Sequence, residues 1–268
     1  MIDDVSDIRE MYNGDPEKEH NRLIQHQLEY DITWRYFEKY LPARGAVLEI
    51  GAATGMYTLE FARRGYTITA VDMSESLLAL CQRRIEEAGC QDNVTFIVAD
   101  ARNLQPLEQQ EFDAVLLMGP LYHLVIEEDR LSALREAYKH LKSGGVLVSS
   151  WINRFGIFGD VMKNIPEWIE NRKEVRSLLE YGRRPEDAPK GGFRGYFTTV
   201  AEIAPLHEKV GFTTLVVAAA EPAISADDES YNVLEGERCR AWLDLLFEVS
   251  TEETTLGASR HLLYIGKK

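Results

Sequence analysis

A loop bracketed by two glycines is the first stretch of the chain whose residues could bind a ligand. The apolar run Val47–Ile50 predicts a strand, and Gly51-Ala-Ala-Thr-Gly55 follows it as a tight turn. Helical sequence continues from about Tyr57 to Arg64, where Gly65 closes it. In an open α/β sheet such a loop lets a ligand approach backbone N–H groups and a helix N-terminus. A turn that merely joins a strand to a helix explains the same residues, so the loop alone does not show that a ligand binds there.

The loop sequence limits the kind of ligand. A dinucleotide loop has a bare second glycine for the pyrophosphate and a small third residue for helix packing. Ala53 and Met56 stand at those places, and no Lys followed by Ser or Thr makes a P-loop here. The loop therefore favours a nucleoside without pyrophosphate over NAD or FAD.

An aspartate follows the second predicted strand. Thr67–Val71 ends at Asp72, 21 residues beyond Gly51, and Ser74 is placed to cap the next helix. A carboxylate at this place accepts hydrogen bonds from both hydroxyls of a ribose. The alternative is that Asp72 is a turn or cap residue before Ser74, and the glycine loop upstream favours the ribose role.

Further strands complete an α/β pattern. Val94–Val98 leads to Asp100, whose carboxylate could accept from an exocyclic amine, and the apolar run Phe112–Met118 leads to Gly119-Pro-Leu-Tyr-His123. Three more strands are expected, at Val146–Ser150, Phe212–Ala219 and His261–Ile265. Successive βα units predict a parallel sheet with right-handed crossovers and helices on both faces.

Composition bounds the class of protein. With 268 residues, 45% of them hydrophobic, the chain can bury one α/β core with an embellishment. A formal charge of −14 argues against a wide nucleic-acid surface. The acidic start does not resemble a signal peptide, no apolar run has membrane-spanning length, and three cysteines without a C-x-x-C pair favour reducing cytoplasm. We expect a cytoplasmic protein without nucleic-acid or membrane partners and, lacking clustered ligand spacing, without a metal.

A single domain over residues 1–268 with two embellishments is expected. Residues 1–44 would form an N-terminal helical cap, and residues 151–196, which follow a strand end and carry several aromatics, would form a lid that covers the substrate. These two segments would supply most of the walls of the acceptor pocket.

Two helices outside the βα units are predicted in detail. One runs from about residue 17 to 41, with an apolar stripe at Tyr30, Trp34, Phe37 and Leu41. The other carries a possible capping box at Thr199 and Glu202, but Pro205 would disrupt its interior, so it is expected to begin late.

In this order, the pieces resemble a class I S-adenosylmethionine-dependent methyltransferase over roughly residues 30–150 and 212–265. The likeness is carried by the glycine loop with Glu49, by the acidic residues after strands two and three, by Met118-Gly-Pro-Leu-Tyr-His123, and by Leu141-Lys-Ser-Gly-Gly145. The Gly-Pro-Leu-Tyr-His string is similar to that of small bacterial methyltransferases of the ubiquinone-biosynthesis-like group. The resemblance implies a Rossmann-like, doubly wound sheet with an antiparallel seventh strand.

The resemblance also implies S-adenosylmethionine as cofactor, with S-adenosylhomocysteine as product. Gly51, Ala53 and Gly55 would pass close to its amino-acid portion, and Glu49 would orient its ammonium group. Asp72 would hold the ribose. The adenine would meet Met73, Asp100 and Ala101, and Met118 would offer a carbonyl at the mouth. Ala53 departs from the glycine common in the family, which is tolerable if its φ is negative.

Methyl transfer from a sulfonium needs alignment first, with removal of a proton as an option. His123 is a candidate base and Tyr122 a candidate for positioning the substrate, although both could simply pack and cap a turn. Three functions follow: a methyltransferase acting on the O, N or S atom of a small molecule, one acting on RNA or protein, and a non-catalytic protein that binds the cofactor.

Overall fold

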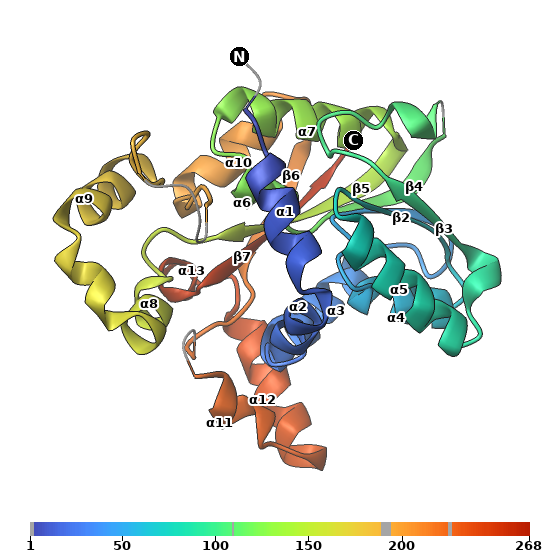
Figure 1. Ribbon diagram of the computed structural model, residues 1–268. Coiled ribbons are helices and arrows are strands. Elements are labelled where there is room, and N and C mark those ends of the chain that lie inside the picture. Colours follow the sequence, from blue (N-terminus) through green and yellow to red (C-terminus); the bar gives the residue numbers. More distant parts are fainter. Residues whose placement is uncertain (1–2, 109, 189–193, 225–226) are drawn as a thin grey trace.

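Seven strands form one mixed sheet in the computed structural model, which describes residues 3–108, 110–188, 194–224 and 227–268. The strands lie in the order β3-β2-β1-β4-β5-β7-β6 (Figure 1). Their bounds are β1 Ala46–Ile50, β2 Thr67–Asp72, β3 Val94–Val98, β4 Phe112–Leu117, β5 Leu141–Ile152, β6 Thr213–Ala219 and β7 His261–Lys267. β1 to β5 pair in parallel, whereas β7 runs antiparallel to β5 and β6. The predicted doubly wound sheet with an antiparallel last strand is confirmed.

Helices cover both faces of this sheet. In the described part of the chain they are α1 Ser6–Gly14, α2 Pro16–Leu23, α3 Gln27–Tyr40, α4 Met56–Arg63, α5 Glu75–Glu87, α6 Pro120–His123, α7 Glu127–Lys139, α8 Phe158–Asn164, α9 Arg172–Tyr181, α10 Val200–Glu208, α11 Asp228–Asn232, α12 Gly236–Val249 and α13 Glu253–Ala258. In Figure 1, α7 and α10 lie above the sheet, and α3 and α4 lie below it.

Side chains of the central strands alternate between two cores. In β4, Leu117 packs in the core that includes residues of α7 and α10, whereas its neighbour Leu116 packs in the core that includes α3 and α4. In β1, Leu48 and Val47 divide in the same way. Burial on both faces explains why these strands read as continuous apolar runs, and it leaves their carboxyl ends as the edge where a ligand can bind.

The helix expected from about residue 17 to 41 is broken in the structure. α2 ends at Leu23, α3 begins at Gln27, and the turn between them carries no glycine or proline that would mark it in the sequence. Contacts from distant residues hold it: Asn232 donates to the Gln25 carbonyl at 2.8 Å, and His26 lies 3.2 Å from Asp228. The expectation of one helix was wrong because tertiary contacts fix this break.

The expected late start of the helix around Pro205 was also wrong. α10 begins at Val200, directly after a capping box in which the Thr199 N–H donates to the Glu202 carboxylate at 2.6 Å. Glu202 also accepts from Tyr196 and lies against Arg154. These contacts anchor the first turn, so the helix continues through Pro205 despite the lost backbone donor.

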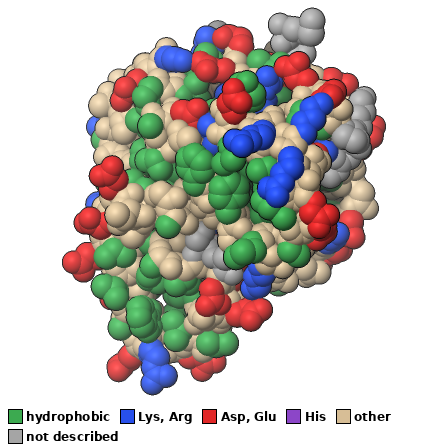
Figure 2. Space-filling view, turned by 90° about the vertical axis from the view of Figure 1, so that its left-hand side faces the viewer, with side chains coloured by type: hydrophobic (Ala, Val, Ile, Leu, Met, Phe, Trp, Pro, Cys, Tyr) green, Lys and Arg blue, Asp and Glu red, His purple; other side chains and the backbone are tan. Residues whose placement is uncertain are grey.

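A helical arm follows β5. α8, the 3₁₀ turn Pro166–Glu170 and α9 stand away from the sheet at the left of Figure 1. Figure 2 faces this side and shows hydrophobic side chains among acidic and basic ones. Residues 189–193 of the predicted lid and residues 1–2 of the predicted cap lie outside the described residues, and both domain assignments stay predictions. None of the described helices combines the length and the apolar character needed to span a membrane.

Candidate functional site

A cavity opens at the carboxyl ends of β1, β2, β3 and β4, and we call it the first cavity. It brings together nine of the predicted site residues: Gly51, Ala53, Asp72, Met73, Asp100, Ala101, Met118, Tyr122 and His123. The remaining two lie elsewhere. Glu49 lines a neighbouring second cavity, and Gly55 is the residue before α4, where its φ of 77° starts the helix.

Asp72 is held in place by the backbone around it. One carboxylate oxygen accepts from the Ala53 N–H and the other from the Ser74 N–H, each at 2.8 Å. Asp72 is buried, and burial raises the pKa of this carboxyl above its ordinary value against the pull of those donors. The two bonds fix the carboxylate between the glycine loop and the start of α5, facing the cavity.

Glu49 is a buried acid whose charge is not balanced by the protein. It is 2% exposed, and its carboxylate accepts from Thr58 at 2.5 Å. In the part of the chain that the structure describes, no basic side chain pairs with it. Burial raises its pKa to about 8. A cationic ligand group in the second cavity would supply the missing positive charge.

The glycine loop comes close to the chain after β4. Gly51 has φ 83°, and a Cβ there would come within 2.6 Å of the Pro120 ring, so only glycine fits. Ala53 has φ 48°, so the condition under which alanine is easily tolerated there, a negative φ, is not met. Its conformation directs its N–H to Asp72, so the left-handed strain fixes the loop against β2.

Asp100 lines the cavity, but its carboxylate already accepts hydrogen bonds from Arg102. Arg102 donates to it from Nη2 at 2.6 Å, from Nε and from its backbone N–H. Burial opposes ionisation, yet these bonds hold the pKa of Asp100 below its ordinary value. Arg102 also donates to Asp129 at 2.9 Å. Any adenine amine bound by Asp100 must therefore share an oxygen with Arg102.

His123 and Tyr122 lie at the junction between the two cavities and the N-terminal segment. Tyr122 lines both cavities, and burial raises the pKa of its phenol. His123 lines the first, with Nε2 at 2.8 Å from the Tyr12 hydroxyl and Nδ1 at 3.3 Å from the Arg194 carbonyl. Burial lowers the pKa of His123 to about 4. The role of His123 as a base stays a prediction, and this geometry, which uses both ring nitrogens, is unfavourable to it.

α1 lies within the predicted N-terminal cap, although it was not predicted as a separate helix, and it forms part of the wall. Tyr12 from this helix and Glu19 and Arg22 from α2 line the first cavity. Arg22 donates to Glu19 from Nε at 2.9 Å and from Nη2 at 2.6 Å, so it brings a paired positive charge to the cavity. The sequence signal that could have located α1 is the Asn13-Gly-Asp-Pro16 turn that separates it from α2.

The comparisons with known proteins agree with this geometry. A family model described as a methyltransferase domain matches residues 47–145. The chain is 26% identical over 130 residues to the putative methyltransferase YqeM of Bacillus subtilis, and this match covers 48% of the chain and 51% of YqeM. It is 36% identical over 150 residues to a ubiquinone biosynthesis O-methyltransferase of Pseudomonas putida, covering 53% of the chain and 62% of that enzyme. The chain thus spans about half to three fifths of the length of these curated relatives.

A solved structure extends the likeness over the whole fold. The magnesium protoporphyrin IX methyltransferase of Synechocystis, crystallised with bound SAH, matches with a TM-score of 0.60 at 14% identity, over 99% of this chain and 100% of that one. At this identity the match shows the fold alone. Residues 47–145 match a methyltransferase domain, and the sheet order and the glycine loop are those expected of class I S-adenosylmethionine-dependent methyltransferases, to which the chain is similar.

Proposed function

We propose that the protein transfers a methyl group from S-adenosylmethionine to a small molecule. The observation that carries this proposal is the pair of buried carboxylates at neighbouring strand ends. Asp72 is fixed by two backbone donors, and Glu49 has no basic partner among the described residues. A ribose diol would donate hydrogen bonds to Asp72, and the cationic amino-acid end of the cofactor would pair with Glu49.

The chain's own residues fit the cofactor at each end. Met73 and Ala101 offer apolar contacts for an adenine ring, with Asp100 beside them. Gly51 leaves room for a close approach to backbone, and Arg22 brings a positive charge suited to a carboxylate. When bound, the cofactor supplies an electrophilic methyl group. The protein aligns it and excludes water, since the N-terminal helices cover the strand ends.

A small-molecule acceptor is favoured over RNA or protein. The net charge of −14 repels nucleic acid, and the N-terminal segment closes over the first cavity, where Val5, Ile8 and Tyr12 line it. The Pseudomonas relative is named as an O-methyltransferase, which supports oxygen as the acceptor atom. The cytoplasmic location predicted from the three cysteines, and the absence of a metal, stay predictions.

The experiment that tests the proposal is binding of S-adenosylmethionine measured by calorimetry with wild type, Asp72→Ala and Asp92→Ala. Asp92 is an exposed aspartate on the turn before β3 and serves as the control. Loss of charge-assisted bonds to a ribose is expected to cost about 2–4 kcal/mol, roughly a 30- to 1000-fold rise in Kd. The control should bind like wild type. No binding by wild type, or undiminished binding by Asp72→Ala, would refute the cofactor assignment.

Release of S-adenosylhomocysteine separates the remaining alternatives. A non-catalytic protein would bind the cofactor and release none with any acceptor. A steep loss of RNA binding as salt is raised would indicate only nonspecific phosphate contacts.

A further inference from the structure

The second cavity joins the cofactor edge of the sheet to the turn between α2 and α3. Glu49 on β1 and Ser150 on β5 both line it, and because β4 lies between those strands, the cavity spans two strand spacings, about 10 Å. His26, Glu29 and Tyr30 form the opposite wall. The two cavities share five residues: Leu23, Gly51, Ala53, Met118 and Tyr122. A molecule in the part beyond Glu49 would therefore lie beside the cofactor.

His26 is oriented by an acidic partner on α11. Its Nδ1 lies 3.2 Å from Asp228 Oδ2 and 3.0 Å from Arg260 Nη2. The two hydrogens of Arg260 Nη2 already have acceptors, since Nη2 also contacts Glu221 at 2.5 Å and Asp228 at 3.2 Å. In the tautomer with the proton on Nδ1, His26 donates to Asp228 and Nε2 keeps its lone pair.

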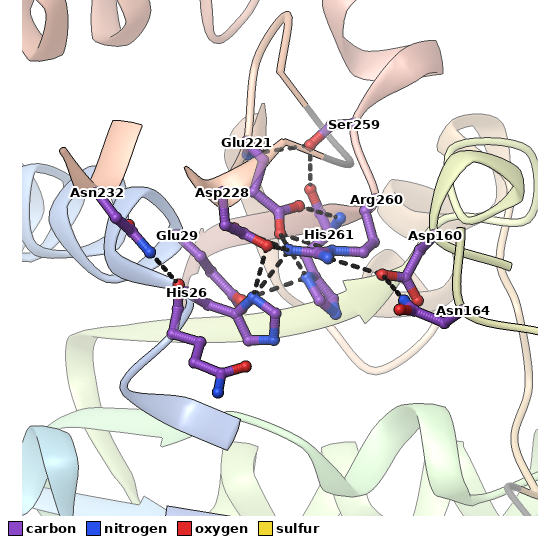
Figure 3. A network of polar contacts seen from close by, with 11 residues as sticks. His26, Glu29, Asp160, Asn164, Glu221, Asp228, Asn232, Ser259, Arg260 and His261 are labelled. Atoms are coloured by element: carbon purple, nitrogen blue, oxygen red, sulfur yellow. Dashed lines mark hydrogen bonds and ion pairs between the residues drawn. The ribbon is translucent and has the colours of Figure 1, made fainter. Parts of the chain in front are cut away.

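The remaining nitrogen faces away from these partners. Figure 3 shows the second ring nitrogen of His26 on the side of the ring opposite Asp228 and Arg260. Among the described residues Nε2 has no hydrogen-bond partner, and His26 lines the second cavity. An aspartate that holds Nδ1–H while Nε2 stays open is the arrangement of a general base.

The charged groups around His26 sum to a net negative charge. Glu29, Glu221 and Asp228 supply three negative charges, against Arg260 and His261 as cations. Burial opposes the charge on His261, but Glu29 and Glu221 raise its pKa to about 10, so it is protonated at neutral pH. One negative charge is left over within this group, and Asp160 on α8 adds another through Arg260.

A metal ion is a poorer occupant of this cluster. Two triads of His and carboxylate groups have ligand atoms close enough for a cation, and they share Glu221. The Arg260 guanidinium already bridges Glu221 and Asp228, and protonated His261 lies between Glu29 and Glu221. A divalent cation would have to displace both positive groups.

The walls of the second cavity select the acceptor. Tyr30 and Tyr57 lie parallel, 5.3 Å between ring centroids, and Met56 adds apolar surface. Ser150 is 5% exposed and its hydroxyl has no hydrogen-bond partner among the described residues, so it can bond a bound polar group. Glu29 and the residual negative charge would repel a carboxylate or phosphate. An uncharged aromatic ring with a hydroxyl group meets each of these features.

We propose that His26, positioned by Asp228, is the general base for methyl transfer, and that the acceptor is a small uncharged aromatic alcohol in the second cavity. This inference rests on the proposed function. The acceptor oxygen uses a lone pair to form the new O–CH3 bond. The C–S bond breaks, its electron pair stays on sulfur as a neutral thioether, and the hydroxyl proton moves to His26 Nε2 and then to solvent.

A chromophore tests the base without turnover. 4-Nitrocatechol changes its visible absorption when its hydroxyl ionises, and it is titrated in complex with S-adenosylhomocysteine and wild type, His26→Gln or His20→Asn. His20, on α2 and hydrogen-bonded to Thr54, is the matched control. In wild type and in His20→Asn the ionisation midpoint of the bound probe is expected to fall by about one pH unit or more relative to the free probe. In His26→Gln that shift should disappear.

Turnover with catechol and S-adenosylmethionine adds a second readout. His26→Gln should lower kcat by roughly 10²–10⁴-fold with unchanged cofactor affinity, and imidazole should partly rescue His26→Gly. Asp228→Asn should lower kcat by about tenfold and leave the KM for cofactor unchanged, as expected of a positioning residue. Circular dichroism of each variant checks that the fold persists.

The outcomes separate this inference from the proposed function. If wild type does not bind S-adenosylhomocysteine, the proposed function itself fails. If it binds the nucleoside but not the probe, or if folded His26→Gln ionises the probe and turns over within threefold of wild type, the inference alone is overturned. Preferential methylation of a primary amine over catechol would overturn the acceptor class.

Discussion

Two buried carboxylates, Glu49 on β1 and Glu221 after β6, are neutralised in different ways. Glu49, at the cofactor edge, has a hydroxyl partner and no cation among the described residues. Glu221, two residues after the end of β6, is 1% exposed and accepts from the Nε of Arg260 at 2.9 Å and from the His261 N–H at 2.7 Å. Glu49 would be neutralised by a cationic ligand, whereas Glu221 is neutralised by cations of the chain itself.

A buried acid without a cation and a buried acid paired with one are suited to different roles in the protein. A buried acid without a counter-charge stays protonated until a nearby cation stabilises its carboxylate, so the site favours a positively charged ligand. A buried acid with a matched cation gives a rigid frame, because breaking either half leaves the other uncompensated. We therefore propose that Glu49 binds a ligand and that Arg260 with Glu221 positions His26.

The largest effect that tests this contrast is expected from Arg260→Met. The arginine side chain is 4% exposed and contacts Glu221, Asp228 and Asp160. Removing it leaves buried carboxylates unpaired, so the free energy of unfolding should fall by about 3–5 kcal/mol. Denaturant unfolding measures the loss, with Arg135→Met as the exposed control, whose ion pair with Glu128 is worth less than about 1 kcal/mol. An equal loss of unfolding free energy in the two variants would show that the buried ion pairs of Arg260 contribute no more than an exposed pair does.

A smaller effect, of opposite sign, is expected from Glu49→Gln. The folded pKa of Glu49 is about 8, above the roughly 4.3 of an unfolded glutamate, so its contribution to stability is fully present below about pH 4 and is lost as pH rises to about 8. A neutral glutamine avoids that loss. Without cofactor, Glu49→Gln should become more stable than wild type by a few kcal/mol near pH 8, and the difference should shrink toward pH 5.

Saturation with S-adenosylmethionine should make wild type more stable than Glu49→Gln. The cofactor's positive charge would stabilise the Glu49 carboxylate, so wild type should gain more in melting temperature from the cofactor than Glu49→Gln does. Thermal melts at pH 5 and pH 8, each with and without cofactor, measure both changes. A melting temperature of Glu49→Gln that shows no pH dependence relative to wild type would mean that the carboxylate is already neutralised within the protein.

The same contrast explains what could be predicted from the sequence. Gly51 follows β1, Asp72 ends β2 and Asp100 lies two residues after β3. The carboxyl ends of parallel strands meet at one edge, so local patterns were enough to place these residues in one cavity. His26 and Asp228 are 202 residues apart and meet only after α11 folds against the turn before α3. No spacing rule links them, and the His-Asp pair was therefore not predicted.

The backbone conformation at two places could not be predicted from the sequence either. Nothing local marks the break at Ile24–His26, because its partners Asp228 and Asn232 come from the other end of the chain. The positive φ of Ala53 also has a distant cause, since the N–H of Ala53 is directed to Asp72 on the next strand. In both places tertiary hydrogen bonds override local preference.

The smallest effect is expected from Ala53→Gly, which tests whether the loop strain belongs to the binding site. An alanine at φ 48° costs about 1–2 kcal/mol that glycine does not, and glycine returns roughly 0.5–1 kcal/mol through the entropy of the unfolded chain. The free energy of unfolding should therefore rise by up to about 1 kcal/mol, while the Ala53 N–H bond to Asp72 is kept. Ala52→Gly is the matched control, because Ala52 is buried, its φ is not positive and the substitution should only destabilise.

If the methyl group of Ala53 contacts the cofactor, Ala53→Gly will also weaken cofactor binding. A gain in stability with unchanged Kd would show that the alanine is only a strained turn residue. Denaturant unfolding and calorimetry of the same two variants distinguish these results, because strain changes the first measurement and ligand contact the second.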